Sequence, residues 1–170
     1  MRSNDLARTL IFGNGGSGKT WLARRLAEAW QRTVIHLDDL RWEPGNYGVP
    51  RDNQAVVNDV IQAGHADQWL MEGVYGWLAK PVLPRATTLV WLDLPEEECL
   101  ANVKARGIQG NGSPEAFEEL IKWISEYRVR DNSSCHKAHS ALFASASVAK
   151  YQLKSRQEIG EFLAANSATP

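Results

Sequence analysis

A glycine-rich segment near the start of the chain constrains the fold more than any other feature. Residues 13–20 read Gly-Asn-Gly-Gly-Ser-Gly-Lys-Thr, which satisfies the pattern G-x-x-x-x-G-K-[ST] in full. A short apolar run at residues 9–12 comes before it, and an amphipathic segment follows that we expect to be helical over residues 18–31. Glycines let consecutive backbone N–H groups curl around phosphate oxygens, and the start of the helix adds the positive end of its dipole. The segment therefore predicts a phosphate-binding loop between a strand and a helix.

Each part of this Walker A motif, or P-loop, has an expected partner on a nucleotide. The residues expected to contact the phosphates are Gly13, Asn14, Gly15, Gly16, Ser17 and Gly18. Lys19 can reach the β- and γ-phosphates, and the Thr20 hydroxyl can ligate Mg²⁺. The motif thus predicts ATP and Mg²⁺ as cofactors. We expect Trp21 to pack in the core, with contact to a bound nucleotide as the alternative.

Short apolar runs alternate with longer amphipathic ones along the whole chain. The predicted strands cover residues 9–12, 33–37, 69–72, 87–92 and 147–153. The predicted helices cover residues 18–31, 51–63, 95–106, 114–130 and 156–165, with a shorter helical piece within 75–83. This alternation is typical of crossover connections and a parallel sheet. We therefore expect an α/β fold with three α/β/α layers, a five-stranded parallel sheet of order 2-3-1-4-5, and one domain over residues 1–170.

Composition and charge restrict the classes of partner. The chain has 170 residues and a net charge of -1, which argues against a surface made for nucleic acid. No run of about 18 apolar residues could cross a bilayer. The two cysteines, Cys99 and Cys135, do not suggest a disulfide framework, and Cys135-His136 with His139 lacks the paired spacing of a structural zinc site. We expect a cytoplasmic protein, monomeric or homodimeric, whose partner is a small molecule.

Carboxylates follow three of the predicted strands, at the edge of the sheet where ligands bind in open α/β folds. Asp38 is the candidate base for an acceptor hydroxyl, and the alternative is a solvated loop carboxylate. Glu72 and Asp93 are the candidates for the acid that holds the Mg²⁺ water shell. We favour Glu72, because its strand should neighbour the P-loop strand, and we expect Asp93 to cap the helix that starts near Pro95.

Arginines and aromatic residues surround this edge. Arg106, Arg128 and Arg130 flank a lid-like segment at about residues 106–130 and can bring positive charge to the phosphates, although arginines at helix ends are also ordinary dipole partners. Arg51 starts a helix after the loop at about residues 38–50 and is assigned to the acceptor side, with a surface role as the alternative. Trp42 and Trp77 lie near the expected acceptor cleft, where a ring can stack on a base or sugar, or can simply pack in the core.

Several segments together resemble the adenylate-kinase-related P-loop proteins, which include nucleoside and nucleotide kinases and proteins labelled DNA topology modulation proteins. The segments are His36-Leu37-Asp38, Trp42-x-Pro44-Gly45, Arg51, Trp-Leu-Met-Glu-Gly-Val-Tyr at 69–75, Leu92-Asp93-Leu94-Pro95 and Leu153-Lys154-Ser155-Arg156. The resemblance implies a nucleoside-monophosphate-kinase-like fold with an ATP site at the P-loop and a lid at 106–130. It also implies an adenine-side loop near residues 154–156, in which Lys154 and Ser155 are the candidate nucleotide contacts. Tyr75 is assigned to the acceptor side with Asp38, Trp42 and Arg51.

These observations predict an ATP- and Mg²⁺-dependent kinase that acts on a small molecule such as a nucleoside, a nucleotide or another hydroxyl metabolite. Two alternatives remain open at this point. The first is a nucleotide-binding regulator or ATPase that acts on a nucleic acid or a protein. The second is a protein that keeps the fold and binds nucleotide without turnover.

Overall fold

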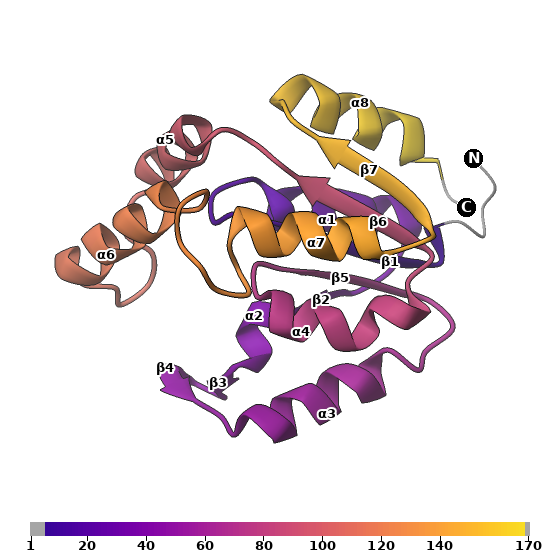
Figure 1. Ribbon diagram of the computed structural model, residues 1–170, viewed down its shortest axis with the longest axis horizontal. Helices are drawn as coiled ribbons and strands as arrows, with labels where there is room; N and C mark the ends of the chain where they lie inside the picture. The colour runs from indigo at the N-terminus through magenta and orange to yellow at the C-terminus, as the bar shows by residue number, and fades with distance from the viewer. Residues whose placement is uncertain (1–5, 169–170) are drawn as a thin grey trace.

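Strands and helices alternate along residues 6–168, the part of the chain that the computed structural model describes (Figure 1). The strands are β1 (Arg8–Gly13), β2 (Val34–His36), β3 (Trp42–Glu43), β4 (Asn46–Pro50), β5 (Trp69–Gly73), β6 (Thr88–Leu92) and β7 (Ala149–Leu153). The α-helices are α1 (Lys19–Trp30), α2 (Leu37–Leu40), α3 (Asn53–Ala63), α4 (Gly76–Ala79), α5 (Glu96–Arg106), α6 (Pro114–Ser125), α7 (His136–Ser145) and α8 (Arg156–Asn166). A 3₁₀ helix, η2 (Lys80–Arg85), follows α4 directly.

The main sheet has five strands in the order β2-β5-β1-β6-β7, and every neighbouring pair is parallel. Counted along the chain without the small β3–β4 hairpin, this is the predicted order 2-3-1-4-5, so the fold class is confirmed. β1 is the central strand, flanked by β5 and β6. Because all strands run in one direction, the segments that follow β1, β2, β5 and β6 meet at one edge of the sheet.

The two faces of the sheet bury different sets of side chains, as the alternation of a strand requires. In β1, Ile11 packs with Leu22 and Leu26 of α1, whereas Leu10 and Phe12 belong to a second cluster on the opposite face. Figure 1 shows α1 and α8 on one side of the sheet and α3, α4 and α7 on the other. The result is the predicted arrangement of three layers, with the sheet in the middle.

Helix α6 ends earlier than predicted. Its last residue is Ser125, whereas the sequence suggested a helix to residue 130. The chain leaves the helix because Tyr127 is fully buried, and its hydroxyl accepts a hydrogen bond from Trp91 Nε1 at 3.1 Å. A further turn of helix would change the direction in which this ring points. Figure 1 shows α5 and α6 beyond the carboxyl ends of the strands.

Two other elements were not predicted. No helix was predicted from the sequence in the segment that forms α7. The N-cap of α7 is Cys135, whose Sγ accepts from Ala138 N at 3.3 Å. Cysteine is not among the residues that signal an N-cap, so the helix start gives little indication in the sequence. The expected loop at residues 38–50 instead contains most of α2 and the antiparallel β3–β4 hairpin.

None of the helices within residues 6–168 is both long enough and apolar enough to serve as a membrane span.

Candidate active site

The P-loop lies between β1 and α1 and is packed tightly against α5. Gly16 has a φ of +75°, and a Cβ added there would lie 2.4 Å from the carbonyl oxygen of Cys99. Gly18, just before α1, has a φ of +94° but has open space where a Cβ would be. The glycine at position 16 is therefore needed for both backbone conformation and close packing, and that at position 18 for conformation only.

Lys19 is nearly buried, with 7% of its surface exposed, and its Nζ donates to the carbonyl oxygen of Asn14 at 2.8 Å. The Asn14 side chain in turn donates from Nδ2 to the carbonyl oxygen of Ile124 at 3.0 Å. The loop is thus curled around its own lysine and tied to the end of α6. This arrangement holds the ammonium group at the mouth of the loop, where phosphate oxygens bind in proteins with this motif.

Thr20, Glu72 and His36 form a small polar cluster beside the P-loop. The Thr20 hydroxyl donates to Glu72 Oε1 at 3.2 Å, and His36 Nδ1 donates to the same oxygen at 2.6 Å. Burial opposes ionisation of Glu72, but the hydrogen bond from His36 and the charge of Lys19 bring the pKa of its carboxyl below the ordinary value. The pKa of His36 is raised by its hydrogen bond to Glu72. A hydroxyl and an ionised carboxylate side by side are oxygen ligands that fit Mg²⁺.

Asp38 lies in the first turn of α2, close to Lys19 and Glu72. Its carboxylate accepts from the backbone N–H groups of Val74 at 3.0 Å and Tyr75 at 3.4 Å, measured to Oδ1. Burial raises the pKa of this carboxyl to about 6; the nearby Lys19 works in the opposite direction. A group with such a pKa changes its protonation state close to neutral pH, as a general base requires.

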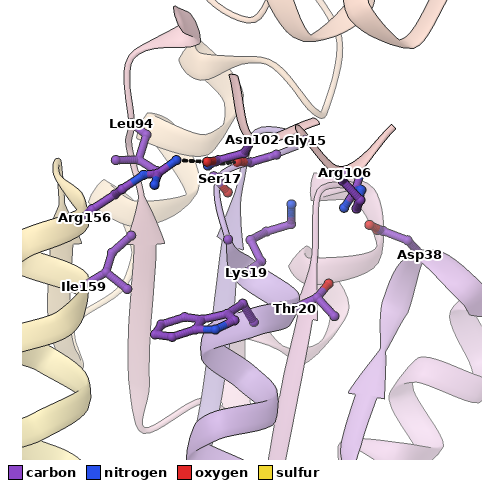
Figure 2. Close-up of a pocket in the computed structure, with 13 residues that line it drawn as sticks. Gly15, Ser17, Lys19, Thr20, Asp38, Leu94, Asn102, Arg106, Arg156 and Ile159 are labelled. Atoms are coloured by element: carbon purple, nitrogen blue, oxygen red, sulfur yellow. Dashed lines mark hydrogen bonds between the residues drawn. The ribbon is translucent and has the colours of Figure 1, made fainter. Parts of the chain in front are cut away.

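The P-loop and Asp38 border one cavity of about 590 Å³, whose lining does not include Glu72 or His36. Residues 15–20 of the P-loop and Asp38 line it together with Arg106, Arg156 and Ile159. Figure 2 shows Arg106 on the same side as Asp38, and Arg156 and Ile159 on the opposite side of Lys19 and Thr20. The cavity therefore brings together cationic groups, an anion-binding loop and a carboxylate.

The arginines predicted for the lid lie in different environments. Arg106, the last residue of α5, lines the cavity. Arg128 is held by Asp93 at 2.8 Å and by Glu96 at 2.5 Å. Arg130 donates to the carbonyl oxygens of Trp123 and Ser134. Of these three, only Arg106 lines the cavity in this structure.

The other predicted nucleotide-side residues are Lys154 and Ser155, in the loop before α8. Ser155 caps the helix, because its hydroxyl accepts from Glu158 N at 3.1 Å, and the Lys154 backbone N–H donates to the Glu158 carboxylate at 2.6 Å. Neither residue lines the cavity, but the next residue, Arg156, does. Arg156 is the last residue of the loop that the resemblance indicated, at residues 154–156.

Two predictions for residues at the edge of the sheet are wrong. Trp21 is not in the core: it is 50% exposed and lines the P-loop cavity, and contact with a nucleotide stays a prediction. Asp93 does not cap α5, whose N-cap is Pro95. Its carboxylate instead binds Arg128, His136 and Gln152 at distances of 2.8, 3.2 and 2.9 Å, because the segment after α6 returns to this edge.

A second cavity, of about 400 Å³, is lined in part by residues that the sequence indicated for the acceptor side. Its lining includes Tyr75, Trp77 and Trp123, together with Arg41 and the segment 132–134. The sequence indicated Tyr75 and Trp77 for this side. Arg41 and Trp123 were not among the predicted residues, and nothing in the local pattern marks Arg41.

Trp42 and Arg51 were also predicted to be on the acceptor side, and neither lines this second cavity. The Trp42 ring packs against Tyr47, with centroids 5.2 Å apart, and against the Arg41 guanidinium. Arg51 donates to Asp59 at 2.6 Å and to the Leu40 carbonyl at 3.0 Å, so its side chain ties the end of α2 to α3.

Helix α7 and the segment before it form hydrogen bonds with the loop after β5. Gly76 N donates to the carbonyl of Ser133 at 3.1 Å, and any Cβ at Gly76 would lie 2.1 Å from that oxygen. Burial lowers the pKa of His139 to about 4, so its ring is neutral at physiological pH. Its Nε2 donates to the Val74 carbonyl at 2.8 Å, which leaves Nδ1 to accept from the Tyr127 hydroxyl at 2.7 Å. His139 thus supports the backbone that binds Asp38.

Comparisons with known proteins identify the fold but no family. No family model matches the chain, and no curated protein matches it in sequence. Solved structures do match: a sugar kinase from Janibacter sp. HTCC2649 has a TM-score of 0.52 at 13% identity and covers 96% of this chain and 98% of its own. A gluconokinase from Sinorhizobium meliloti 1021 has a TM-score of 0.57 at 16% identity, covering 95% and 89%. Shikimate kinase from Aquifex aeolicus has a TM-score of 0.53 at 12% identity, covering 93% and 94%. The chain therefore has the fold of P-loop kinases.

Proposed function

We propose that this protein is a kinase that transfers the γ-phosphoryl group of Mg-ATP to a hydroxyl group of a small molecule. The observation that carries the proposal is that Asp38, whose pKa is raised to about 6, borders the same cavity as Lys19 and Thr20. A carboxylate close to the P-loop is suited to accept the proton of an attacking hydroxyl. The kinase structures of the same fold support this interpretation.

In the proposed mechanism, the P-loop backbone and Lys19 bind the β- and γ-phosphates. Thr20 and Glu72 would hold Mg²⁺, which when bound offsets phosphate charge. Asp38 orients the acceptor hydroxyl and takes its proton as the oxygen attacks the γ-phosphorus and the bond to ADP breaks. The N–H groups of Val74 and Tyr75 fix the direction of the Asp38 carboxylate.

The remaining assignments complete the proposal. Arg106 would offset the charge of the transferred group from the cavity wall. Arg128 and Arg130, at the end of the lid-like segment 106–130, would contribute after a rearrangement that frees them from their present partners. The loop at Lys154 and Ser155 would border the adenine, and Trp42 and Arg51 would shape the acceptor side through the β3–β4 hairpin. None of these roles requires more than one domain.

The test is a search for a phosphorylated product. The purified protein is incubated with Mg-ATP and pools of nucleosides, nucleotides, sugars and hydroxy acids, and the products are followed by phosphorus NMR and mass spectrometry. A product formed by the wild type and not by Lys19→Ala supports a kinase. Lys104→Ala, which removes an exposed lysine on α5, is the matched control and should keep the activity.

Two outcomes would contradict the proposal. ATP that decays to ADP and phosphate without a phosphorylated product would favour an ATPase acting on a macromolecular partner. ATP that is bound but stays intact with every pool would favour a nucleotide-binding protein without turnover.

A further inference from the structure

Arg41 is enclosed by aromatic rings and has no acidic partner. Its guanidinium carbon lies 4.9 Å from the ring centroid of Trp42, 5.1 Å from that of Tyr75 and 5.9 Å from that of Trp77. Its Nε is buried without a hydrogen-bond partner, and no carboxylate within residues 6–168 forms an ion pair with it. A buried donor on a cation is costly to leave unpaired. An anion bound beside Arg41 would offset this cost.

The cavity beside Arg41 suits a bound molecule. Its lining combines three rings, those of Tyr75, Trp77 and Trp123, with the polar residues of segment 132–134, and it contains no acidic residue. Arg130 packs on the Trp123 ring, with its guanidinium carbon 3.5 Å from the ring centroid, but it does not line the cavity. Its two terminal nitrogens donate to backbone carbonyls. Arg41 is therefore the only cationic side chain that lines this second cavity.

The cavity adjoins the candidate base. Tyr75 lines it, and the backbone N–H of the same residue donates to Asp38 Oδ1 at 3.4 Å. Asp38 in turn borders the P-loop cavity. Tyr75 is therefore shared between the lining of the second cavity and the hydrogen bonds that position Asp38.

We propose that the second cavity binds a carboxylate group through Arg41, and that the acceptor is a hydroxy acid with a flat or apolar body. The planar fork of a guanidinium matches the two oxygens of a carboxylate, and the rings hold that fork in place. One arginine balances one negative charge. A phosphate monoester carries a charge of about −1.5 to −2 at neutral pH, so part of its charge would remain uncompensated here. The role of the hydroxyl rests on the proposed kinase function, whereas binding of the carboxylate does not.

The test measures binding without ATP, so that it does not depend on catalysis. Calorimetry and ligand-observed NMR are applied to a set of ring hydroxy acids that includes 4-(hydroxymethyl)benzoate and 3-hydroxycyclohexanecarboxylate. Each acid is paired with its neutral carboxamide and with the phosphate monoester of the same body. We expect at least one acid to bind at least about tenfold more tightly than its carboxamide, because hydrogen bonds to charged groups are the stronger ones.

Substitutions test whether Arg41 causes the preference for acids over carboxamides. Arg41→Gln should remove it and leave the binding of the carboxamides unchanged. Arg41→Lys, which keeps the charge and loses the fork, should retain part of it and covers the case in which the glutamine variant does not fold. Lys80→Gln is the control: it removes an exposed positive charge at the start of η2, outside both cavities, and should bind as the wild type does.

Three results would overturn the proposal. They are the absence of preference for every acid over its carboxamide, a preference that survives Arg41→Gln, and tighter binding of the phosphate esters than of the acids. Each can occur whether or not the product search reveals a kinase. Conversely, carboxylate binding that depends on Arg41 in a protein that phosphorylates nothing would leave this inference standing and contradict only the proposed function.

Discussion

The two cavities are built in opposite ways. The P-loop cavity is lined largely by one contiguous segment, residues 15–20, and its tight turn depends on glycine. The second cavity is formed by side chains from separate parts of the chain, with Arg41 after α2, Trp77 in α4 and Trp123 in α6. A local motif can fix the position of a common group such as phosphate, whereas a particular acceptor requires side chains collected from several elements. The predictions below test whether the two regions can be disturbed separately.

The largest effect is expected at Asp38, which lines the P-loop cavity. Asp38→Asn keeps the size of the side chain but removes the base, so turnover should fall by about 10²–10⁴-fold, the usual contribution of such a group. In the wild type, kcat/KM should rise with pH through about 6 and level off above it, because Asp38 must lose its proton to act. The measurement is a pH profile with the acceptor found in the product search. A variant that retains wild-type turnover would exclude Asp38 as the base.

The next effect concerns the packing of the P-loop. Gly16→Ala places a Cβ 2.4 Å from the Cys99 carbonyl oxygen and 2.7 Å from Val103 Cγ2, at a φ of +75°. We expect a loss of about 2–4 kcal/mol in the free energy of unfolding, since backbone strain and overpacking add. Gly18→Ala has a similar φ but open space, so it should cost only about 1 kcal/mol. Urea unfolding of both variants gives the difference, and equal losses would show that the contact with α5 does not matter.

A third substitution should separate the two regions in binding. Lys19→Ala removes the cation at the mouth of the P-loop, and ATP affinity should fall by about 10–100-fold, the range for a charge-assisted hydrogen bond. The affinity of the second cavity for a carboxylate should not change, because Lys19 is not among its lining residues. Calorimetry with each ligand alone measures both. A parallel loss of the two affinities would mean that the cavities act as one site.

The contrast between the regions also explains what the sequence could predict. The sheet order and the P-loop follow from local patterns, namely short apolar runs and one motif of eight residues, and both appear in the structure. Arg41 was missed because the rings around it come from positions 42, 75 and 77, which approach one another only in the fold. Position in the chain gave no indication that Arg128 would pair with Asp93, or that segment 132–134 would line a cavity.

Trp21 is a second case in which the sequence pattern did not predict the environment of a side chain. Helical periodicity favours the core for a large apolar residue in the first turn of an amphipathic helix. The residue is 50% exposed because it faces the cavity of the P-loop rather than the sheet. Hydrophobicity alone does not distinguish a core position from the wall of a binding cavity.

The smallest predicted effect is on stability and again concerns Asp38. Its pKa is about 6 in the folded protein, above the ordinary value of about 3.9 in an unfolded chain. Between these values the folded state binds a proton that the unfolded state has released, so this carboxyl makes stability fall as pH rises from about 4 to 6. Asp38→Asn does not titrate. Its melting temperature should therefore exceed that of the wild type by a few degrees at pH 7.5, with the difference shrinking as pH falls toward 4.

This last measurement needs no substrate, which makes it independent of the kinase proposal. Thermal unfolding followed by circular dichroism at pH 4, 5, 6 and 7.5 is sufficient, with Asp39→Asn as the matched control, because Asp39 is the exposed neighbour in α2. We expect the melting temperature of Asp39→Asn to equal that of the wild type at every pH, while the excess for Asp38→Asn grows with pH. This result would show that the ionised Asp38 carboxylate lowers the stability of the folded protein. A constant difference at every pH would instead assign the effect to packing.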